Sequence, residues 1–275
     1  MALPEGEAEA SQPRALAAQV ASREGLIVLA CVLTMAALAW WWLVGLEAEM
    51  AAMVAAPMGG MAMHGITMPP PAEPFSVPYF ASTFTMWAIM MVAMMLPTAA
   101  PMIALHEVFS RKNGQGGLAT AMFAGGYLVV WTYFAAMAAL IQTALVAKGM
   151  VDAAQLQFGS HRLSALLLFG AGIYELSPLK RVCLSNCQSP VIFLVRNWRP
   201  GVAGAFQMGR RHGAYCLGCC AVLMLLLFVG GVMNLAWIAL LTVVVLAEKY
   251  APPRWRADRI LAVCLLAAAV VVWLC

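Results

Sequence analysis

Residues 213–248 read GAYCLGCCAVLMLLLFVGGVMNLAWIALLTVVVLAE. This stretch carries no charged side chain before Glu248. It is also longer than the roughly 20 residues that one helix needs to cross the hydrocarbon core of a bilayer. Gly230-Gly231-Val232-Met233-Asn234 divides it, and such a Gly-rich break is typical of a turn. The stretch therefore predicts two membrane helices joined by a short connection.

The composition of the whole chain also indicates a membrane protein. Hydrophobic residues make up 64% and charged residues 10% of the 275 residues, whereas a soluble domain carries roughly 25% charged residues. A soluble protein of this size would lack the polar surface needed to cover itself. Further apolar runs predict membrane helices at about 26–46, 78–105, 118–147, 161–178 and 259–275.

We therefore expect an all-α fold, a polytopic transmembrane helical bundle of about seven spans. The bundle would occupy residues 26–275. Residues 1–25, which are acidic, Ala-rich and polar, would form a disordered cytoplasmic tail.

The basic residues predict the orientation of this bundle. With the N-terminus in the cytoplasm, Lys148 and Arg162 fall outside, and the other 14 of the 16 Lys and Arg residues fall inside. The positive-inside rule favours this arrangement. Treating residues 213–248 as one span would move the four basic residues of segment 249–259 outside. We therefore predict a multi-pass protein of a bacterial inner membrane, with an outer loop at about 47–77, an inner loop at about 179–212 and the C-terminus outside.

Methionines gather in two places. The outer loop holds a soft-ligand group in a Gly- and Pro-rich context, namely Met58, Met61, Met63, His64 and Met68. The helix at 78–105 carries a stripe with helical spacing, namely Met86, Met90 and Met94. Thioether sulfur is a ligand that suits Cu(I). The alternative for the helical stripe is apolar packing, since Met is a flexible gap filler. In the same helix, Pro97 and Pro101 are expected to kink or interrupt the backbone.

Five of the eight cysteines lie close together in the sequence, near His212. They form two patterns, Cys183-x3-Cys187 and His212-x3-Cys216-x2-Cys219-Cys220. On a helix the second pattern covers an arc of about 100°. Its ends are about 12 Å apart along the axis, too far for one ion to bind both. The remaining ligands are therefore expected from Cys183 and Cys187.

Three other interpretations of the cysteines stay open. Zn(II) also accepts Cys and His ligands, so it is the alternative to Cu(I). Cysteines also serve as small apolar packing residues, which is our interpretation of the isolated Cys31, Cys264 and Cys275. Disulfide exchange is disfavoured, because a cluster facing the cytoplasm would be kept reduced.

Two charged groups lie near the predicted inner ends of helices. Glu175 is expected to pair with Lys180 or Arg181, because an unpaired carboxylate at this depth would be costly. Glu248 and Lys249 are expected to mark a solvated helix boundary. The sequence holds no phosphate-binding Gly loop, no hydrolase nucleophile elbow and no zincin helix. We therefore assign no catalytic residue and expect no enzyme activity.

Three motifs carry a family resemblance. The first is Met86-Trp87 through Met90-Met91-x2-Met94-Met95-x-Pro97, with Ala100-Pro101-Met102 after it. The second is Tyr174-Glu175-x-Ser177-Pro178-Leu179-Lys180-x2-Cys183-Leu184-x2-Cys187-x2-Pro190. The third is Gly209-x2-His212-Gly213-x-Tyr215-Cys216-x-Gly218-Cys219-Cys220, continuing to Gly231-Val232-Met233-Asn234-Leu235 and Glu248-Lys249.

These motifs resemble a bacterial family of predicted metal-binding integral membrane proteins, a domain of unknown function. The resemblance covers about residues 78–250 and implies a bound metal. It does not extend to the outer Met/His loop.

Together these features predict an integral membrane protein that handles a soft metal, Cu(I) in the first place. The outer loop would gather the metal, the helix at 78–105 would pass it on, and the inner Cys/His site would hold it. The alternatives are a membrane metal sensor or assembly factor without transport, and a thiol-disulfide oxidoreductase. The expected partners are the lipid bilayer and a metallochaperone or metalloprotein client, with a homo-oligomer left open and nucleic acid excluded.

Overall fold

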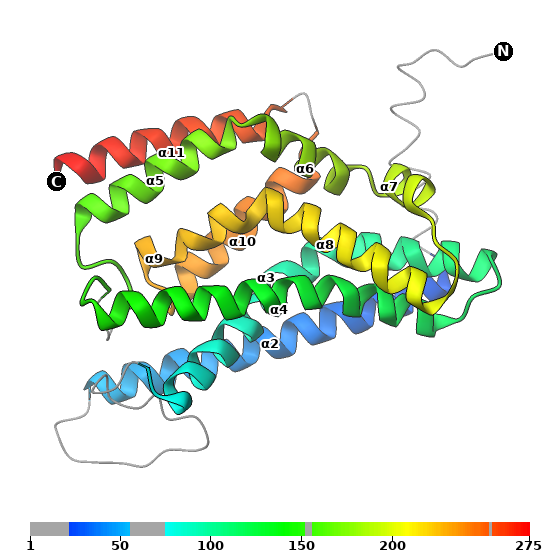
Figure 1. Cartoon of the computed structure of the whole chain (residues 1–275), viewed down its shortest axis with the longest axis horizontal. Coiled ribbons are helices and arrows are strands. Elements are labelled where there is room, and N and C mark those ends of the chain that lie inside the picture. The colour runs from blue at the N-terminus through cyan, green and yellow to red at the C-terminus, as the bar shows by residue number, and fades with distance from the viewer. Residues whose placement is uncertain (1–21, 56–74, 152–155, 253–254) are drawn as a thin grey trace.

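The computed structural model describes residues 22–55, 75–151, 156–252 and 255–275 (Figure 1). In these ranges the chain is helical apart from its connections and one isolated β-bridge between Val151 and Phe158. The predicted all-α class is confirmed. The helices are α2 (Arg23–Ala55), α3 (Val77–Lys112), α4 (Gly117–Ala147), α5 (His161–Glu175), α6 (Pro178–Gln188), α7 (Pro190–Asn197), α8 (Gly201–Leu225), α9 (Leu227–Gly230), α10 (Leu235–Tyr250) and α11 (Ala257–Leu274).

Five helices in the described part of the chain are long and apolar enough to cross a membrane. They are Arg23–Met50, Val77–Lys112, Gly117–Ala147, Gly201–Gly230 and Ala257–Leu274. The other two predicted spans correspond to α5 and α10, which have 15 and 16 residues. Both are shorter than the roughly 20 residues of an ordinary span. The structure therefore supports a membrane protein with at least five candidate spans, and the count of seven stays a prediction.

The predicted break after residue 230 is confirmed. Helix α9 ends at Gly230, and Gly231 has a φ of +93°, which only glycine adopts readily. Asn234 then starts α10 by accepting a hydrogen bond from the backbone N–H of Trp237 at 3.1 Å.

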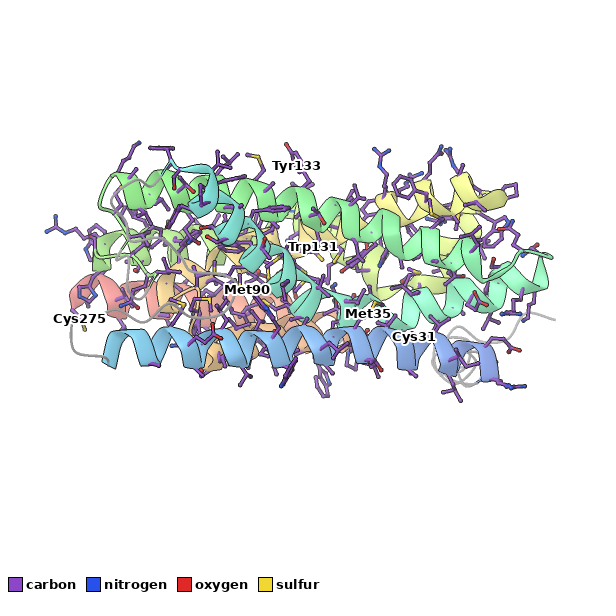
Figure 2. All side chains as sticks on the ribbon, turned by 90° about the horizontal axis from the view of Figure 1, so that it is seen from below. Cys31, Met35, Met90, Trp131, Tyr133 and Cys275 are labelled. Carbon is purple, nitrogen blue, oxygen red and sulfur yellow. The ribbon has the colours of Figure 1, made fainter. Side chains whose placement is uncertain are left out.

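Helices α3, α4 and α8 form the centre of the bundle. Figure 1 shows α2 along one side of this centre and the paired α5 and α11 along the other. The apolar window of α3 is 72% buried, against 22% for α2 and 17% for α11. In Figure 2, Met90 of α3 lies inside the bundle, whereas Tyr133 of α4 points outward. The core therefore sits around α3, and the outermost helices keep broad apolar faces exposed.

Glycines bring α4 and α8 into backbone contact. A Cβ added at Gly209 of α8 would overlap the carbonyl oxygen of Phe123, and one added at Gly126 of α4 would overlap that of Phe206. Small residues at such positions let membrane helices approach closely. This contact fixes which face of α8 points toward α4.

Helix α3 continues through both prolines, so of the predicted kink or interruption at Pro97 and Pro101 only the interruption is wrong. Proline lacks the N–H that would bond the carbonyl four residues earlier. For Pro97 that carbonyl is Ala93, which accepts instead from the indole N–H of Trp40 on α2 at 3.1 Å. A neighbouring helix thus satisfies the freed group, as membrane proteins commonly allow.

The predicted loops are shorter in the structure. Helix α2 starts at Arg23 and continues to Ala55, so neither the tail to residue 25 nor the outer loop from residue 47 keeps its predicted boundary. The segment predicted as the inner loop, 179–212, contains α6 and α7, and α8 begins at Gly201 rather than near 213; its position on the inner side stays a prediction. The polar composition of this segment favoured a loop, although the segment also contains strong signals for helix starts. Ser177 caps α6 by accepting from the N–H of Lys180, and prolines open α6 and α7.

Candidate metal centre

Helix α6 lies against α8 and brings the two cysteine patterns together. The sulfur of Cys187 on α6 is 3.9 Å from that of Cys219 on α8. The sulfurs of Cys219 and Cys220 are 3.2 Å apart. Cys183 lies one turn before Cys187, and its sulfur packs against the Cα of Gly218. The loop that the sequence predicted to supply these thiols does so as a helix.

Cys216 is the most enclosed of these residues. It is 0% exposed and lies one turn before Cys219 and Cys220 on α8. Its backbone carbonyl accepts from Cys219 Sγ at 3.2 Å. We call Cys187, Cys216, Cys219 and Cys220 the thiol cluster.

A buried lysine reaches into the thiol cluster. The Nζ of Lys249 donates to Cys216 Sγ at 3.0 Å and to Thr98 Oγ1 at 2.7 Å. Tyr250, next in α10, donates its hydroxyl to the Thr98 carbonyl at 3.0 Å. The prediction of a solvated boundary at Glu248 and Lys249 is wrong, since the two residues are only 3% and 6% exposed. The last turn of α10 faces other helices, and both charged groups find partners there.

Tyr127 of α4 approaches Cys216 from the opposite side. Its hydroxyl is 3.2 Å from Cys216 Sγ and 2.9 Å from the carbonyl oxygen of Met95. The single hydroxyl proton can therefore turn either to the carbonyl or to the sulfur. Cys216 thus has two potential hydrogen-bond donors, Lys249 and Tyr127.

A buried ion triad holds α6 in place. Lys180 of α6 pairs with Glu175 of α5 and with Glu248 of α10, the latter at 2.8 Å. The predicted pairing of Glu175 is confirmed with Lys180, while Arg181 donates to the carbonyl of Leu176 instead. Burial on its own lowers the pKa of Lys180, but the carboxylates of Glu248 and Glu175 outweigh it and raise that pKa. The triad ties three helices together and so positions Cys183 and Cys187.

His212 lies one turn before Cys216 in an aromatic enclosure. Its ring centroid is 5.3 Å from that of Phe193, 5.7 Å from that of Tyr127 and 6.1 Å from that of Phe123. Its Nδ1 is buried without a hydrogen-bond partner within the described residues. The imidazole ring is therefore packed among aromatic side chains, and its Nδ1 remains available as a ligand atom.

The methionine stripe of α3 lies entirely in the core. Met86, Met90 and Met94 are at most 2% exposed, and so are Met91 and Met95 of the second stripe. Because both stripes are buried, burial alone does not distinguish a methionine path for metal from ordinary core packing. Met95 of the second stripe lies near the surroundings of Cys216, because its carbonyl oxygen accepts from Tyr127 and from Thr98. The outer group of Met58, Met61, Met63, His64 and Met68 lies outside the described residues.

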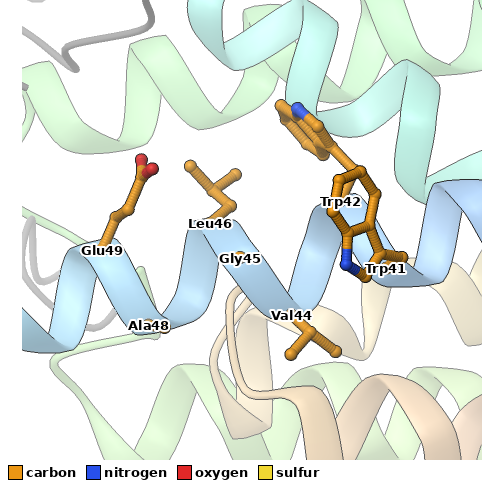
Figure 3. Close-up of a pocket in the computed structure, with 7 residues that line it drawn as sticks. All are labelled: Trp41, Trp42, Val44, Gly45, Leu46, Ala48 and Glu49. Atoms are coloured by element: carbon orange, nitrogen blue, oxygen red, sulfur yellow. The ribbon is translucent and has the colours of Figure 1, made fainter. Parts of the chain in front are cut away.

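The three remaining cysteines and a cavity on α2 lie away from the thiol cluster. Cys31, Cys264 and Cys275 are exposed on helix exteriors, so their predicted role as packed fillers is wrong. A cavity of about 400 Å³ lies on α2 and is lined by seven residues of that helix alone (Figure 3). Only Glu49 among them is ionisable. This cavity offers no set of metal ligands.

The side-chain types of the thiol cluster suit a soft metal, but their positions do not form a complete metal site. Within the described ranges, no group of three or more His, Cys, Asp and Glu side chains is arranged to hold a metal ion. Cys219 Sγ instead lies close to two other sulfurs, that of Cys220 at 3.2 Å and that of Cys187 at 3.9 Å. Thiolates select Cu(I) and Zn(II) among common metals, and Cu(I) also accepts a simple pair of thiolates. A site for Cu(I) therefore needs only two of the four cysteines, whereas a tetrahedral Zn(II) site needs four ligands.

The family model for PpoB2, copper chaperone, matches residues 84–272. This chain belongs to that family. The match includes the whole thiol cluster, Lys249 and the buried triad, and it assigns the chain a copper-handling role. Membership in this family supports an association with copper. No curated protein and no solved structure matches the chain.

The sequence did not predict three polar residues around Cys216: Lys249 and Tyr127, which contact its sulfur, and Thr98, which accepts from Lys249. Lys249 had a usable signal, because Glu248-Lys249 is part of the third motif and a charged pair ends an otherwise apolar helix. Thr98 and Tyr127 lie in α3 and α4 without any local pattern that sets them apart. Only the packing of these helices against α8 and α10 brings them to Cys216.

Proposed function

We propose that this protein is a membrane copper chaperone that binds Cu(I) in the thiol cluster and hands it to a client protein. One observation carries the proposal: four cysteine side chains from two helices gather beside a buried lysine ammonium. Apolar packing alone would require neither four clustered thiols nor a buried cation. Soft sulfur donors match the copper-handling role of the family.

The arrangement suits transfer as well as binding. Cys216, Cys219 and Cys220 are fully buried, while Cys187 is only partly buried and Cys183 lies one turn away on the same helix. A client thiolate could displace the partly buried Cys187 first and the buried thiolates afterwards. Burial raises the pKa of the Cys183 thiol, so Cys183 stays protonated until a metal or a partner displaces the proton. We therefore assign α6 as the transfer side and α8 as the holding side, with His212 as an additional ligand on α8.

The membrane setting of this chaperone is a seven-span bundle with the N-terminus in the cytoplasm. Five helices are long enough to span, and α5 and α10 complete the count as shorter helices beside α11 and α9. The asymmetry of Lys and Arg supports this orientation. It places the inner end of the bundle, where α6 lies, at the cytoplasmic face.

We further propose that the methionines supply copper to the thiol cluster from outside. The loop with Met58, Met61, Met63, His64 and Met68 would capture Cu(I), and its thioether ligands keep their binding capacity at any pH. The buried row of Met86, Met90 and Met94 leads from that side toward Met95, whose carbonyl contacts Tyr127. Thioether groups along this row match the softness of Cu(I).

The test is the copper content of cysteine variants. Purified protein, reduced and loaded with Cu(I), is expected to retain stoichiometric copper. Cys216→Ser and Cys219→Ser are each expected to lose most of it, because a hydroxyl is similar in size but is a poor ligand for Cu(I). Cys264→Ser, on the exposed face of α11, is the matched control and is expected to keep full copper.

Full copper in both cluster variants would contradict the proposed site. Absence of copper from the wild-type protein, together with reduction of a disulfide substrate, would favour the oxidoreductase alternative instead. If the protein retained zinc in place of copper, the proposed metal would be wrong, but the proposed ligand site would still hold.

A further inference from the structure

The two buried lysines of this protein have different surroundings. Lys180 lies between two carboxylates. Lys249 contacts a neutral hydroxyl and a sulfur, and within the described residues no carboxylate lies at ion-pair distance from it. A buried ammonium without a counter-charge is strongly disfavoured. The sulfur of Cys216, as a thiolate, is the group at hand that can provide this charge.

The position of Lys249 is held by packing around it. Its ammonium is anchored by Thr98 on α3, and the neighbouring Tyr250 binds the carbonyl of the same threonine. Lys249 also lies in the last turn of α10, where the helix dipole favours a cation. The charge is thus fixed beside the thiol cluster rather than free to move to solvent.

We propose that Lys249 determines the metal selectivity of the thiol cluster by balancing the charge of a Cu(I) ion held between two thiolates. This inference rests on the proposed Cu(I) site. Two thiolates and one Cu(I) carry one negative charge, which the ammonium cancels. Zn(II) reaches the same neutral total only with three thiolates and one neutral ligand; with all four thiolates it keeps one negative charge beside Lys249, and with two thiolates and neutral ligands it keeps one positive charge. In a buried site an uncancelled charge is costly, so the fixed ammonium favours Cu(I) between two thiolates over Zn(II) held by two or by all four thiolates.

Lys249 therefore acts through Cys216 as a positioning and specificity-determining residue, without touching the metal. Tyr127 contributes a hydrogen bond to the same sulfur but no charge. Residues that support a metal site from behind its ligands typically change affinity by about 10- to 100-fold when replaced. The distinctive effect expected here is on the ratio of the two metal affinities.

The experiment compares Lys249→Met, Lys249→Arg and Tyr250→Phe with the wild type. Each protein is purified in detergent, and Cu(I) and Zn(II) are titrated separately against competing chelators under reducing conditions. Lys249→Met removes the charge at similar length, and it is expected to lower Cu(I) affinity by about 10- to 100-fold with a smaller loss for Zn(II). Lys249→Arg is expected to retain the wild-type Cu(I)/Zn(II) ratio. Tyr250→Phe removes a hydrogen bond to the same threonine without changing charge, and is expected to leave the ratio unchanged.

Equal losses for both metals in Lys249→Met, or a ratio that Lys249→Arg fails to restore, would overturn the selectivity role. If Lys249→Met does not fold, Lys249→Gln takes its place with the same expected ratio change. Failure of the proposed function looks different, since the wild type would then bind no Cu(I), or Cys216→Ser would bind it as well as the wild type.

Discussion

At the scale of single residues, the two buried lysines perform separate tasks. Lys249 faces sulfur, whereas Lys180 pairs with two buried carboxylates. Removing one member of a buried ion pair leaves the others uncompensated, which typically costs about 3 to 5 kcal/mol. Lys180 is therefore a stability residue that also holds the transfer helix α6 in place.

This division predicts the behaviour of Lys180→Met. The variant is expected to lower the thermal unfolding midpoint in detergent clearly, because Glu175 and Glu248 lose their shared cation. Lys180→Arg, which keeps the charge, is expected to lose less. Folded Lys180→Met should still prefer Cu(I) over Zn(II) as the wild type does. An unfolding midpoint equal to that of the wild type would show that the triad does not contribute to stability.

At the scale of elements, the decisive contact is the backbone packing of α4 on α8. Gly126, Gly209 and Gly213 line it, and each lies directly against the opposite helix. This contact also orients α8 so that Cys216 points to Tyr127. Loss of the contact would therefore disturb both stability and the thiol cluster.

Adjacent glycines in α4 provide a matched test of this contact. A Cβ at Gly126 would overlap the backbone of Phe206, whereas a Cβ at Gly125 meets nothing within 4 Å. Gly126→Ala is expected to lower the unfolding midpoint and the copper content together. Gly125→Ala is expected to be neutral or slightly stabilising, by up to about 1 kcal/mol, because alanine favours the helix. Similar unfolding midpoints for the two variants would mean that the close contact between α4 and α8 does not contribute to stability.

At the scale of the whole molecule, the short helices α5 and α10 determine the topology. A seven-span chain places residue 199 in the cytoplasm. If only the five long helices crossed, the segment between α4 and α8 would stay outside and carry Lys180, Arg181, Arg196 and Arg199 with it. The positive-inside rule disfavours that arrangement.

Reporter fusions distinguish the two topologies. A reporter enzyme active only outside the cytoplasm is expected to be active after Met68 and at the C-terminus, and silent after Arg199 and Arg254. The fusion after Arg199 is decisive, because a five-span chain would make it active. The fusion at the C-terminus is expected to be active in both cases and so serves as the positive control.

The sequence by itself determined the helical class and the position of most helices. Apolar runs of sufficient length and the break at Gly230-Gly231 are local signals, and helix periodicity is a local property. For the same reason the sequence placed Cys216, Cys219 and Cys220 on one face of a helix. It failed for the segment 179–212, where polar residues outweighed the capping signals of Ser177 and the prolines.

The tertiary structure alone decided what surrounds those cysteines. Thr98 and Lys249 are 151 residues apart in sequence, and Cys216 and Lys249 are 33 apart, yet they form one hydrogen-bonded group. Which helix faces meet depends on glycine contacts and on the pairing of buried charges, and neither is visible in the periodicity of a single helix. Lys249 could thus be predicted as the charged end of a helix, while its place beside a thiol followed only from the packing of α10 against α3 and α8.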